Sequence, residues 1–214
     1  MKKFTKVLAV LLAVAVFATA FAACSKNGGT SSKVKVIDIA LSDEEYAFGV
    51  DKNQPELKQQ VNDFVAEIKS NGKLDEICNK YFADGTPEGI TSATQDPSKD
   101  QLVVATNAEF APFEYKQGDQ FFGIDMEIAN LLAQKLNKEL VIVDMAFDAV
   151  LLSVQQGKAD IGMAGLTVTE ERAQQVDFSD SYYSASQKLI VKEGDTTFDN
   201  CKTKEDVDAI LKGC

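Results

Sequence analysis

The sequence of 214 residues contains no histidine. Histidine is the commonest general base in enzymes and the commonest zinc ligand, so its absence argues against imidazole catalysis and against a zinc site. Cysteine is also scarce: Cys24, Cys78, Cys201 and Cys214 include no CxxC pair. We therefore expect no metal and no other cofactor. Cys201 and Cys214 could pair in an oxidising compartment, but spacing alone does not decide this.

Basic residues are few as well. The chain has 22 lysines and arginines against 33 acidic residues, which gives a formal net charge of −11. Residues 1–23 hold three lysines and no acidic residue, so the remainder of the chain carries a charge of −14. Nucleic acids and anionic lipids attract basic surfaces, and a surface this acidic argues against nucleic acid as a partner.

The N-terminus has the features of a secretory signal. Lysines at positions 2, 3 and 6 precede an uncharged apolar run over 7–21, and small residues lead directly to Cys24. This pattern resembles the bacterial lipoprotein signal, in which the cysteine is lipidated and becomes the new N-terminus. We expect a signal peptide over 1–23, a lipid anchor (palmitate) on Cys24, and a flexible Gly/Ser-rich tether over 24–33. A plain signal peptide and an uncleaved anchor are the alternatives. The prediction is a protein held at the cell membrane on its extracytoplasmic side, periplasmic or on the outer face.

Two structured segments flank a linker. Residues 34–82 combine short strands with two amphipathic helices, over 55–71 and 74–81. Residues 83–100 are rich in Gly, Pro, Thr, Ser and Asp, and this composition is typical of a linker. Residues 101–192 form the expected ligand-binding lobe.

That lobe shows strands and helices in alternation. Its strands are expected near 102–106, 140–143, 160–164 and 187–191, and its helices near 124–136, 148–156 and 169–175. A βαβαβ run of this kind predicts a parallel sheet with right-handed crossovers. Residues 193–214 follow and end on a short acidic helix.

Ligands of open α/β sheets bind outside the carboxyl ends of the strands. The residues after the predicted strands combine aromatic faces, an amide, a hydroxyl, backbone N–H groups and an arginine. They are Asn107, Phe110, Phe147, Ala164, Gly165, Thr167 and Arg172. Thr167 has capping-box spacing to Glu170, and Thr169 is a second possible N-cap, so a helix start here would favour a small anion. Apolar walls with a few convergent polar groups predict a small-ligand site at this edge.

Five sequence segments follow one another in the order of a known family. They are 107–115 (NAEFAPFEY), 123–129 (GIDMEIA), 157–160 (GKAD), 167–172 (TVTEER) and 176–183 (VDFSDSYY). They resemble the amino-acid-type extracellular solute-binding proteins of ABC importers (family 3), which have the two-lobed type II periplasmic-binding fold. The resemblance implies a protein that is not an enzyme. It would capture an amino acid and serve the permease of an ABC transporter.

The resemblance also implies roles for single residues. Arg172 would hold the α-carboxylate of the amino acid, together with the Thr167 hydroxyl and the backbone N–H groups of Gly165 and Thr167. Phe110 and Phe147 would enclose the ligand side chain. Asn107 stands where many members carry an aspartate.

The chain order departs from the family. Residues 42–50, the helix over 55–71 and residues 79–82 look like the family's C-terminal end, yet they precede the half that carries the site. The expected fold is an α/β, parallel-sheet lobe of the periplasmic-binding type, in permuted order and lacking most of the second lobe. Residues 193–214 would be a truncated entry to that second lobe. The acidic residue that pairs with the ligand α-ammonium in the family would be missing with it, and the sequence offers no candidate.

Two other functions stay open on the sequence alone. One is a sensor or remnant domain that no longer binds a ligand. The other is an enzyme, because the family has dehydratase and peptidoglycan-lyase relatives. An enzyme of that kind needs a positioned acid or base, and without histidine the candidates are Glu109, Glu114 and Asp125, of which Glu109 is the best.

Overall fold

The computed structural model describes residues 33–83 and 85–213. Two compact units divide these residues, one over 40–187 and the other over 33–39 together with 188–213. The predicted signal peptide, nearly all of the predicted tether, Cys24 and Cys214 lie outside the described residues. In the part of the chain that is described, no helix is long and apolar enough to cross a membrane.

The larger unit is built on a sheet in the order β10-β3-β9-β4-β8. Its middle strands are β4 (Gln101–Thr106) and β9 (Ile161–Gly162), and β8 (Glu139–Asp144) forms one edge. These strands run parallel, which confirms the predicted α/β fold. The sheet is nevertheless mixed, because β3 (Gly49–Val50) pairs antiparallel with both β9 and β10 (Asp177–Phe178). No crossover helix joins β3 to β9, so the rule that makes βαβ neighbours parallel does not apply to it.

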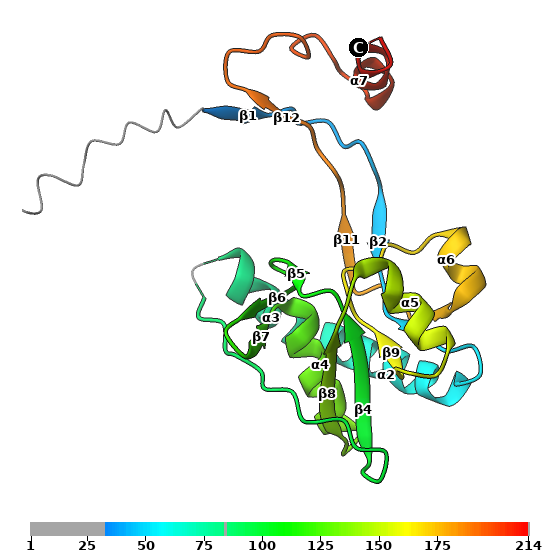
Figure 1. Ribbon diagram of the computed structural model, residues 1–214. Coiled ribbons are helices and arrows are strands. Elements are labelled where there is room, and N and C mark those ends of the chain that lie inside the picture. Colours follow the sequence, from blue (N-terminus) through cyan, green and yellow to red (C-terminus); the bar gives the residue numbers. More distant parts are fainter. Residues whose placement is uncertain (1–32, 84, 214) are drawn as a thin grey trace, which may run out of the picture. The chain divides into compact units, whose positions relative to one another are not determined.

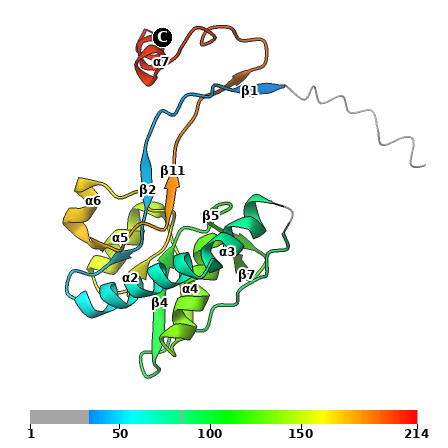
Figure 2. The ribbon, with the colours of Figure 1, turned by 180° about the vertical axis from the view of Figure 1, so that it is seen from behind.

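Helices cover both faces of this sheet. On one face, α2 (Pro55–Ser70), α3 (Lys73–Phe82) and α4 (Ile124–Lys135) pack over β4 and β8. On the other face lies α5 (Phe147–Gln155). Figure 1 shows α5, and Figure 2 shows α2 and α3 from behind.

Strand β4 shows why the helices divide in this way. Leu102 and Val104 point into the core under α2 and α4, whereas Ala105 points into the smaller core under α5. Successive side chains of a strand face opposite sides, so an apolar run such as this one needs cover on both faces.

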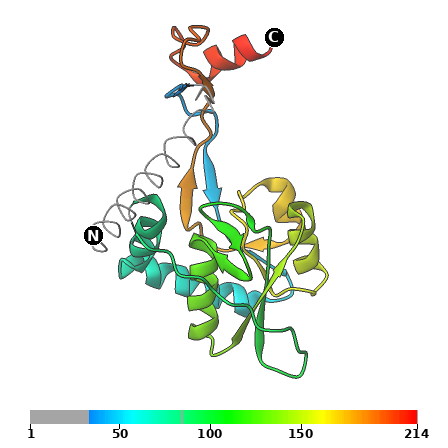
Figure 3. The same ribbon diagram turned by 60° about the vertical axis from the view of Figure 1, so that its left-hand side comes forward.

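Residues 40–82, most of the segment that precedes the linker, are part of the same unit. Strand β2 (Glu44–Tyr46) pairs antiparallel with β11 (Tyr183–Ala185), and these strands run side by side as the blue and orange ribbon in Figure 3. Tyr46 also forms an antiparallel bridge with Thr167. Elements from the two ends of the sequence therefore meet at the edge where the site was predicted.

A three-stranded antiparallel sheet was not foreseen. It consists of β5 (Glu109–Phe110), β6 (Glu114–Gln117) and β7 (Gln120–Phe122). The β6–β7 turn is Gly118-Asp119, with Gly118 at φ +61°, as a two-residue hairpin requires. Ile90, from the predicted linker, is buried and bridges to Phe121, so this stretch of the linker packs against the hairpin.

The smaller unit has three elements. Strand β1 (Val34–Val36) pairs antiparallel with β12 (Ile190–Lys192), and α7 (Lys204–Leu211) starts at a capping box between Thr203 and Asp206. Lys35 and Asp199 form an ion pair. Beyond the strands, its buried apolar side chains in the described residues are Ile37, Phe198 and Val207.

Candidate functional site

All seven residues of the predicted ligand site line one cavity of the larger unit. Its volume is about 380 Å3, which lies in the range of small-molecule sites. Its lining adds five residues that the sequence had not assigned to ligand binding: Glu44, Tyr46, Glu109, Glu114 and Gln187. The strand ends thus converge as parallel-sheet geometry requires, and β2 adds Glu44 and Tyr46 to the lining.

Two phenylalanines form the apolar surfaces of this cavity. Phe110 on β5 is 43% exposed and Phe147 at the start of α5 is 38% exposed, high values for such large apolar side chains. The Phe110 ring stacks on Phe113, with 5.5 Å between the ring centroids. A Cβ at Gly165 would lie 2.9 Å from the Phe110 ring. Glycine at this position therefore lets the aromatic ring lie directly against the backbone.

Arg172 is the only arginine of the chain. It lies in the short helix α6 (Glu170–Gln175), and its Nη1 donates to the carbonyl oxygen of Thr167 at 2.9 Å. Its guanidinium lies 5.1 Å from the centroid of the Phe147 ring, a cation–π arrangement. Arg172 forms no ion pair with any residue that the structure describes. The guanidinium is held in place while its charge stays available to an anion.

The N-cap of α6 is Thr169, whose hydroxyl accepts the Arg172 N–H at 3.2 Å. Of the two threonines considered from the sequence, Thr167 is therefore not the cap. Thr167 lies two residues earlier, in the bridge with Tyr46. On either side of this bridge, the Ala47 N–H donates to the Leu166 carbonyl oxygen and the Val168 N–H donates to the Glu45 carbonyl oxygen. Residues of such a non-hydrogen-bonded pair turn their own N–H away from the partner strand. The Thr167 N–H has no hydrogen-bond partner among the described residues.

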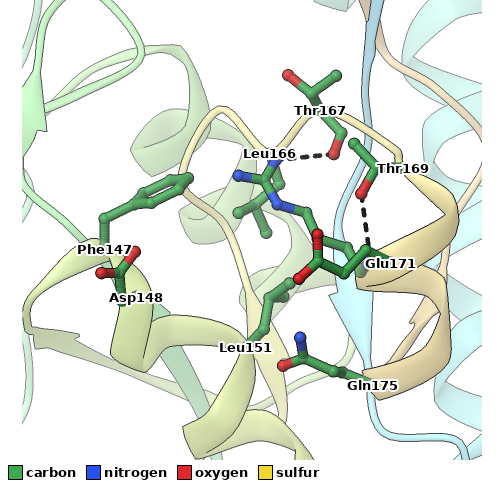
Figure 4. A pocket seen from close by; sticks show the side chains of 9 residues that line it. Phe147, Asp148, Leu151, Leu166, Thr167, Thr169, Glu171 and Gln175 are labelled. Atoms are coloured by element: carbon green, nitrogen blue, oxygen red, sulfur yellow. Dashed lines mark hydrogen bonds between the residues drawn. The ribbon is translucent and has the colours of Figure 1, made fainter.

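A second cavity, of about 600 Å3, lies between α5 and α6. Figure 4 shows Phe147 and Leu151 on one side of it and Thr169, Glu171 and Gln175 on the other. Phe147, Thr167 and Arg172 line both cavities. The arginine therefore stands at the boundary between them.

The Gly165 N–H is already engaged. It donates to Asp125 Oδ2 at 3.0 Å, in a buried hydrogen bond. This orientation follows from the backbone of Gly165, which has a φ of +52°. The resemblance implied that this N–H would contact the ligand carboxylate, whereas here it holds the loop onto α4. Gly165 lines the cavity with its remaining backbone surface.

Two buried carboxyl groups lie at the cavity, Glu114 in its lining and Asp125 behind it. Glu114 and Asp125 both have no exposed surface. Asp125 accepts from the Tyr182 hydroxyl as well as from Gly165, but neither oxygen of Glu114 has a hydrogen-bond partner among the described residues. Burial, together with the Asp125 charge, raises the pKa of Glu114 to about 11, and burial raises the pKa of Asp125 to about 7. The pair therefore retains a proton at neutral pH.

The other candidates occupy different environments. Asn107 donates its side-chain amide to the Met145 carbonyl at 2.9 Å and so ties the loop after β4 to the loop after β8. Glu109, the best candidate for an enzymatic acid or base, is exposed and lines the cavity. Asp125 is fully engaged behind it.

Glu44 had no signal of its own in the sequence. Its neighbours alternate along β2, so that Glu44 and Tyr46 share the face toward the cavity. That alternation could have indicated the face, but only the pairing of β2 with β11 and Thr167 places it beside Arg172.

Comparisons with known proteins match mainly the second half of the chain. The family described as bacterial extracellular solute-binding proteins, family 3, matches residues 102–213. The arginine-binding extracellular protein ArtP of Bacillus subtilis is 37% identical over 105 residues, which is 49% of this chain and 41% of that protein. A probable histidine-binding protein of Neisseria gonorrhoeae is 37% identical over 92 residues, 42% of this chain and 34% of that protein.

One of the similar solved structures is of a single domain. It is an arginine-bound form of domain 1 from TmArgBP, 32% identical, with a TM-score of 0.39 over 53% of this chain and 91% of that domain. The chain thus spans about two fifths or less of the length of these two curated relatives, and most of the solved domain.

Proposed function

Because the chain belongs to the bacterial extracellular solute-binding proteins of family 3, we propose that it captures a free amino acid outside the cytoplasm and passes it to the permease of an ABC transporter. The observation that carries this proposal is Arg172, an unpaired guanidinium at the cavity edge beside the outward-facing N–H of Thr167. A planar guanidinium and a backbone N–H together suit a carboxylate. The α-carboxylate of the amino acid would bind there.

The side chain of the bound amino acid would lie between Phe110 and Phe147 and would be basic. Besides the buried, protonated Glu114, two carboxylates line the cavity, those of Glu44 and Glu109, and Arg172 is the only cation among the described lining residues. Aromatic faces also attract organic cations. The names of the two curated relatives, which refer to arginine and to histidine, support the same class.

Substitution of Arg172 by alanine tests the carboxylate site. We expect Arg172→Ala to weaken binding of L-arginine about tenfold to a hundredfold, because hydrogen bonds to charged groups contribute about 1.5–3 kcal/mol. The measurement is isothermal titration calorimetry, with L-histidine and L-glutamine titrated in parallel. Lys158→Ala is the matched control, since it removes one positive charge from an exposed turn outside the cavity. Equal affinities of the two variants would contradict the proposal, as would a chain that binds none of these amino acids.

Anchoring belongs to the same proposal. We expect that Cys24→Ser, produced in a bacterium with a lipoprotein pathway, moves most of the protein from the membrane fraction to the soluble extracytoplasmic fraction, because lipid attachment needs the thiol. Incorporation of labelled palmitate into the two forms is the measurement. Cys78→Ser is the control, because it removes a thiol from α3 and leaves the N-terminal cysteine in place. Label in the Cys24→Ser variant would place the lipid elsewhere.

A further inference from the structure

Two opposite charges line the ligand cavity without pairing with each other. Glu44 lies at the start of β2, Arg172 lies in α6, and no ion pair joins either of them to another residue in the described ranges. Thr167 stands between them. Its hydroxyl donates to Glu44 Oε2 at 3.2 Å, and its carbonyl oxygen accepts from Arg172 Nη1 at 2.9 Å. One residue therefore holds a negative and a positive group apart on the same cavity wall.

Neutral donors hold the Glu44 carboxylate in position. Besides Thr167, Ser42 Oγ donates to it at 2.7 Å and Gln187 Nε2 at 3.5 Å. These hydrogen bonds, that from Ser42 first, lower the pKa of Glu44 below its ordinary value. Glu44 is consequently ionised at neutral pH although no described cation neutralises it. A charge that is positioned but not neutralised suits a cationic group supplied from outside.

The neighbouring glutamate shows that this placement follows from the strand. Glu45 points to the opposite face of β2, where the hydroxyls of Ser181 and Ser184 donate to it, and it does not line the cavity. The two side chains have the same chemistry and adjacent positions, yet only Glu44 faces Arg172. The difference makes Glu45 an internal control.

We infer that Glu44 binds the α-ammonium of the amino acid whose α-carboxylate binds Arg172, so that this lobe alone recognises the whole zwitterionic head group. The inference rests on the proposed function. The ammonium and carboxylate of an α-amino acid are attached to the same carbon, so a receptor must offer an anionic and a cationic group a short distance apart. Glu44 and Arg172, spaced by Thr167, meet that requirement. The ammonium has three donors, and the carboxylate of Glu44 can accept from it while it retains Ser42 and Gln187.

The test compares free and Nα-acetylated ligands, because acetylation removes the ammonium and leaves the carboxylate. Calorimetry of the full chain would use L-arginine and L-glutamine, each against its Nα-acetyl derivative. The wild type should bind the free amino acid more tightly, by up to about fivefold, as expected for one partly exposed ion pair. Glu44→Gln should lose that preference by weakening only the free amino acid. Glu45→Gln should retain it.

Three outcomes separate the inference from the proposed function. If Glu44→Gln keeps the preference of the wild type while Arg172→Ala loses binding, the inference fails and the proposed function stands. If the wild type binds both members of each ligand pair equally, the inference is also overturned, whatever the variants do. If the wild type binds no amino acid, both fail. Thermal melting of Glu44→Gln shows whether it is folded, and the wild-type comparison remains decisive when it is not.

Discussion

Gly123→Ala is expected to destabilise the protein by more than about 3 kcal/mol, or to prevent folding, because it combines a forbidden backbone conformation with a backbone collision. Gly123 has a φ of +127°, where residues with a Cβ are strongly disfavoured. A Cβ there would lie 2.0 Å from the Phe113 carbonyl oxygen. That oxygen cannot move freely, since it accepts the Asp125 N–H at the first turn of α4. Gly123 itself donates to the Tyr81 hydroxyl, so a shift in either direction breaks a contact.

Gly118→Ala is the matched control for this prediction. Gly118 also has a positive φ, +61°, but among the described atoms none lies within 4 Å of its would-be Cβ. Gly118→Ala should lower the free energy of unfolding by only about 1–2 kcal/mol, the penalty of a left-handed backbone. Urea denaturation of the three proteins measures the free energies of unfolding. Similar losses in both variants would mean that the collision at Phe113 is relieved by relaxation.

Glu114→Gln is expected to change how the stability depends on pH. The pKa of Glu114 is raised from an ordinary value of 4.5 to about 11 in the folded protein. A carboxyl group with a raised folded pKa contributes stability that is fully present below its unfolded pKa. This contribution is lost as the pH rises toward the folded pKa. The wild type should therefore lose stability between pH 5 and 8 relative to the glutamine variant, by at most about 4 kcal/mol, since one pKa unit corresponds to 1.36 kcal/mol.

The readout is the difference between wild type and variant at pH 5, 6.5 and 8, measured by urea denaturation. A constant offset would reflect the buried amide alone, whereas a difference that grows with pH reports the proton held by Glu114. Glu109→Gln is the control, because Glu109 is an exposed glutamate on the neighbouring strand β5. Parallel curves for the wild type and Glu114→Gln would show that the buried pair is ionised in the folded state.

Much of the fold could be predicted from local pattern. The apolar stripe of Leu57, Val61, Phe64 and Ile68 predicted α2, and all of these residues are buried. The alternation of strands and helices after the linker predicted the parallel pairing of β4, β8 and β9. The hairpin of β6 and β7 was missed although Gly118-Asp119 is a turn signal, because a strand of three or four residues leaves little periodicity to detect.

Some residues of the candidate site could likewise be predicted from the sequence, and others could not. Asn107, Phe110, Phe147 and Arg172 could be predicted because each follows a strand or starts a helix, and parallel strands bring such positions to one edge. Glu44 could not. It precedes the linker, and only the antiparallel pairing of β2 with β11 and the bridge to Thr167 bring it to the cavity.

The sequence by itself determined the α/β class, the family, the lack of histidine and which residues follow the strands at the cavity, because these depend on composition and on patterns within one element. Only the tertiary structure decided that the Gly165 N–H turns inward to Asp125, that Glu114 is buried with no hydrogen-bond partner among the described residues, and that Glu44 lies across Thr167 from Arg172. Hydrogen-bond partners and ionisation depend on groups brought together from distant segments, and no local pattern records those distances.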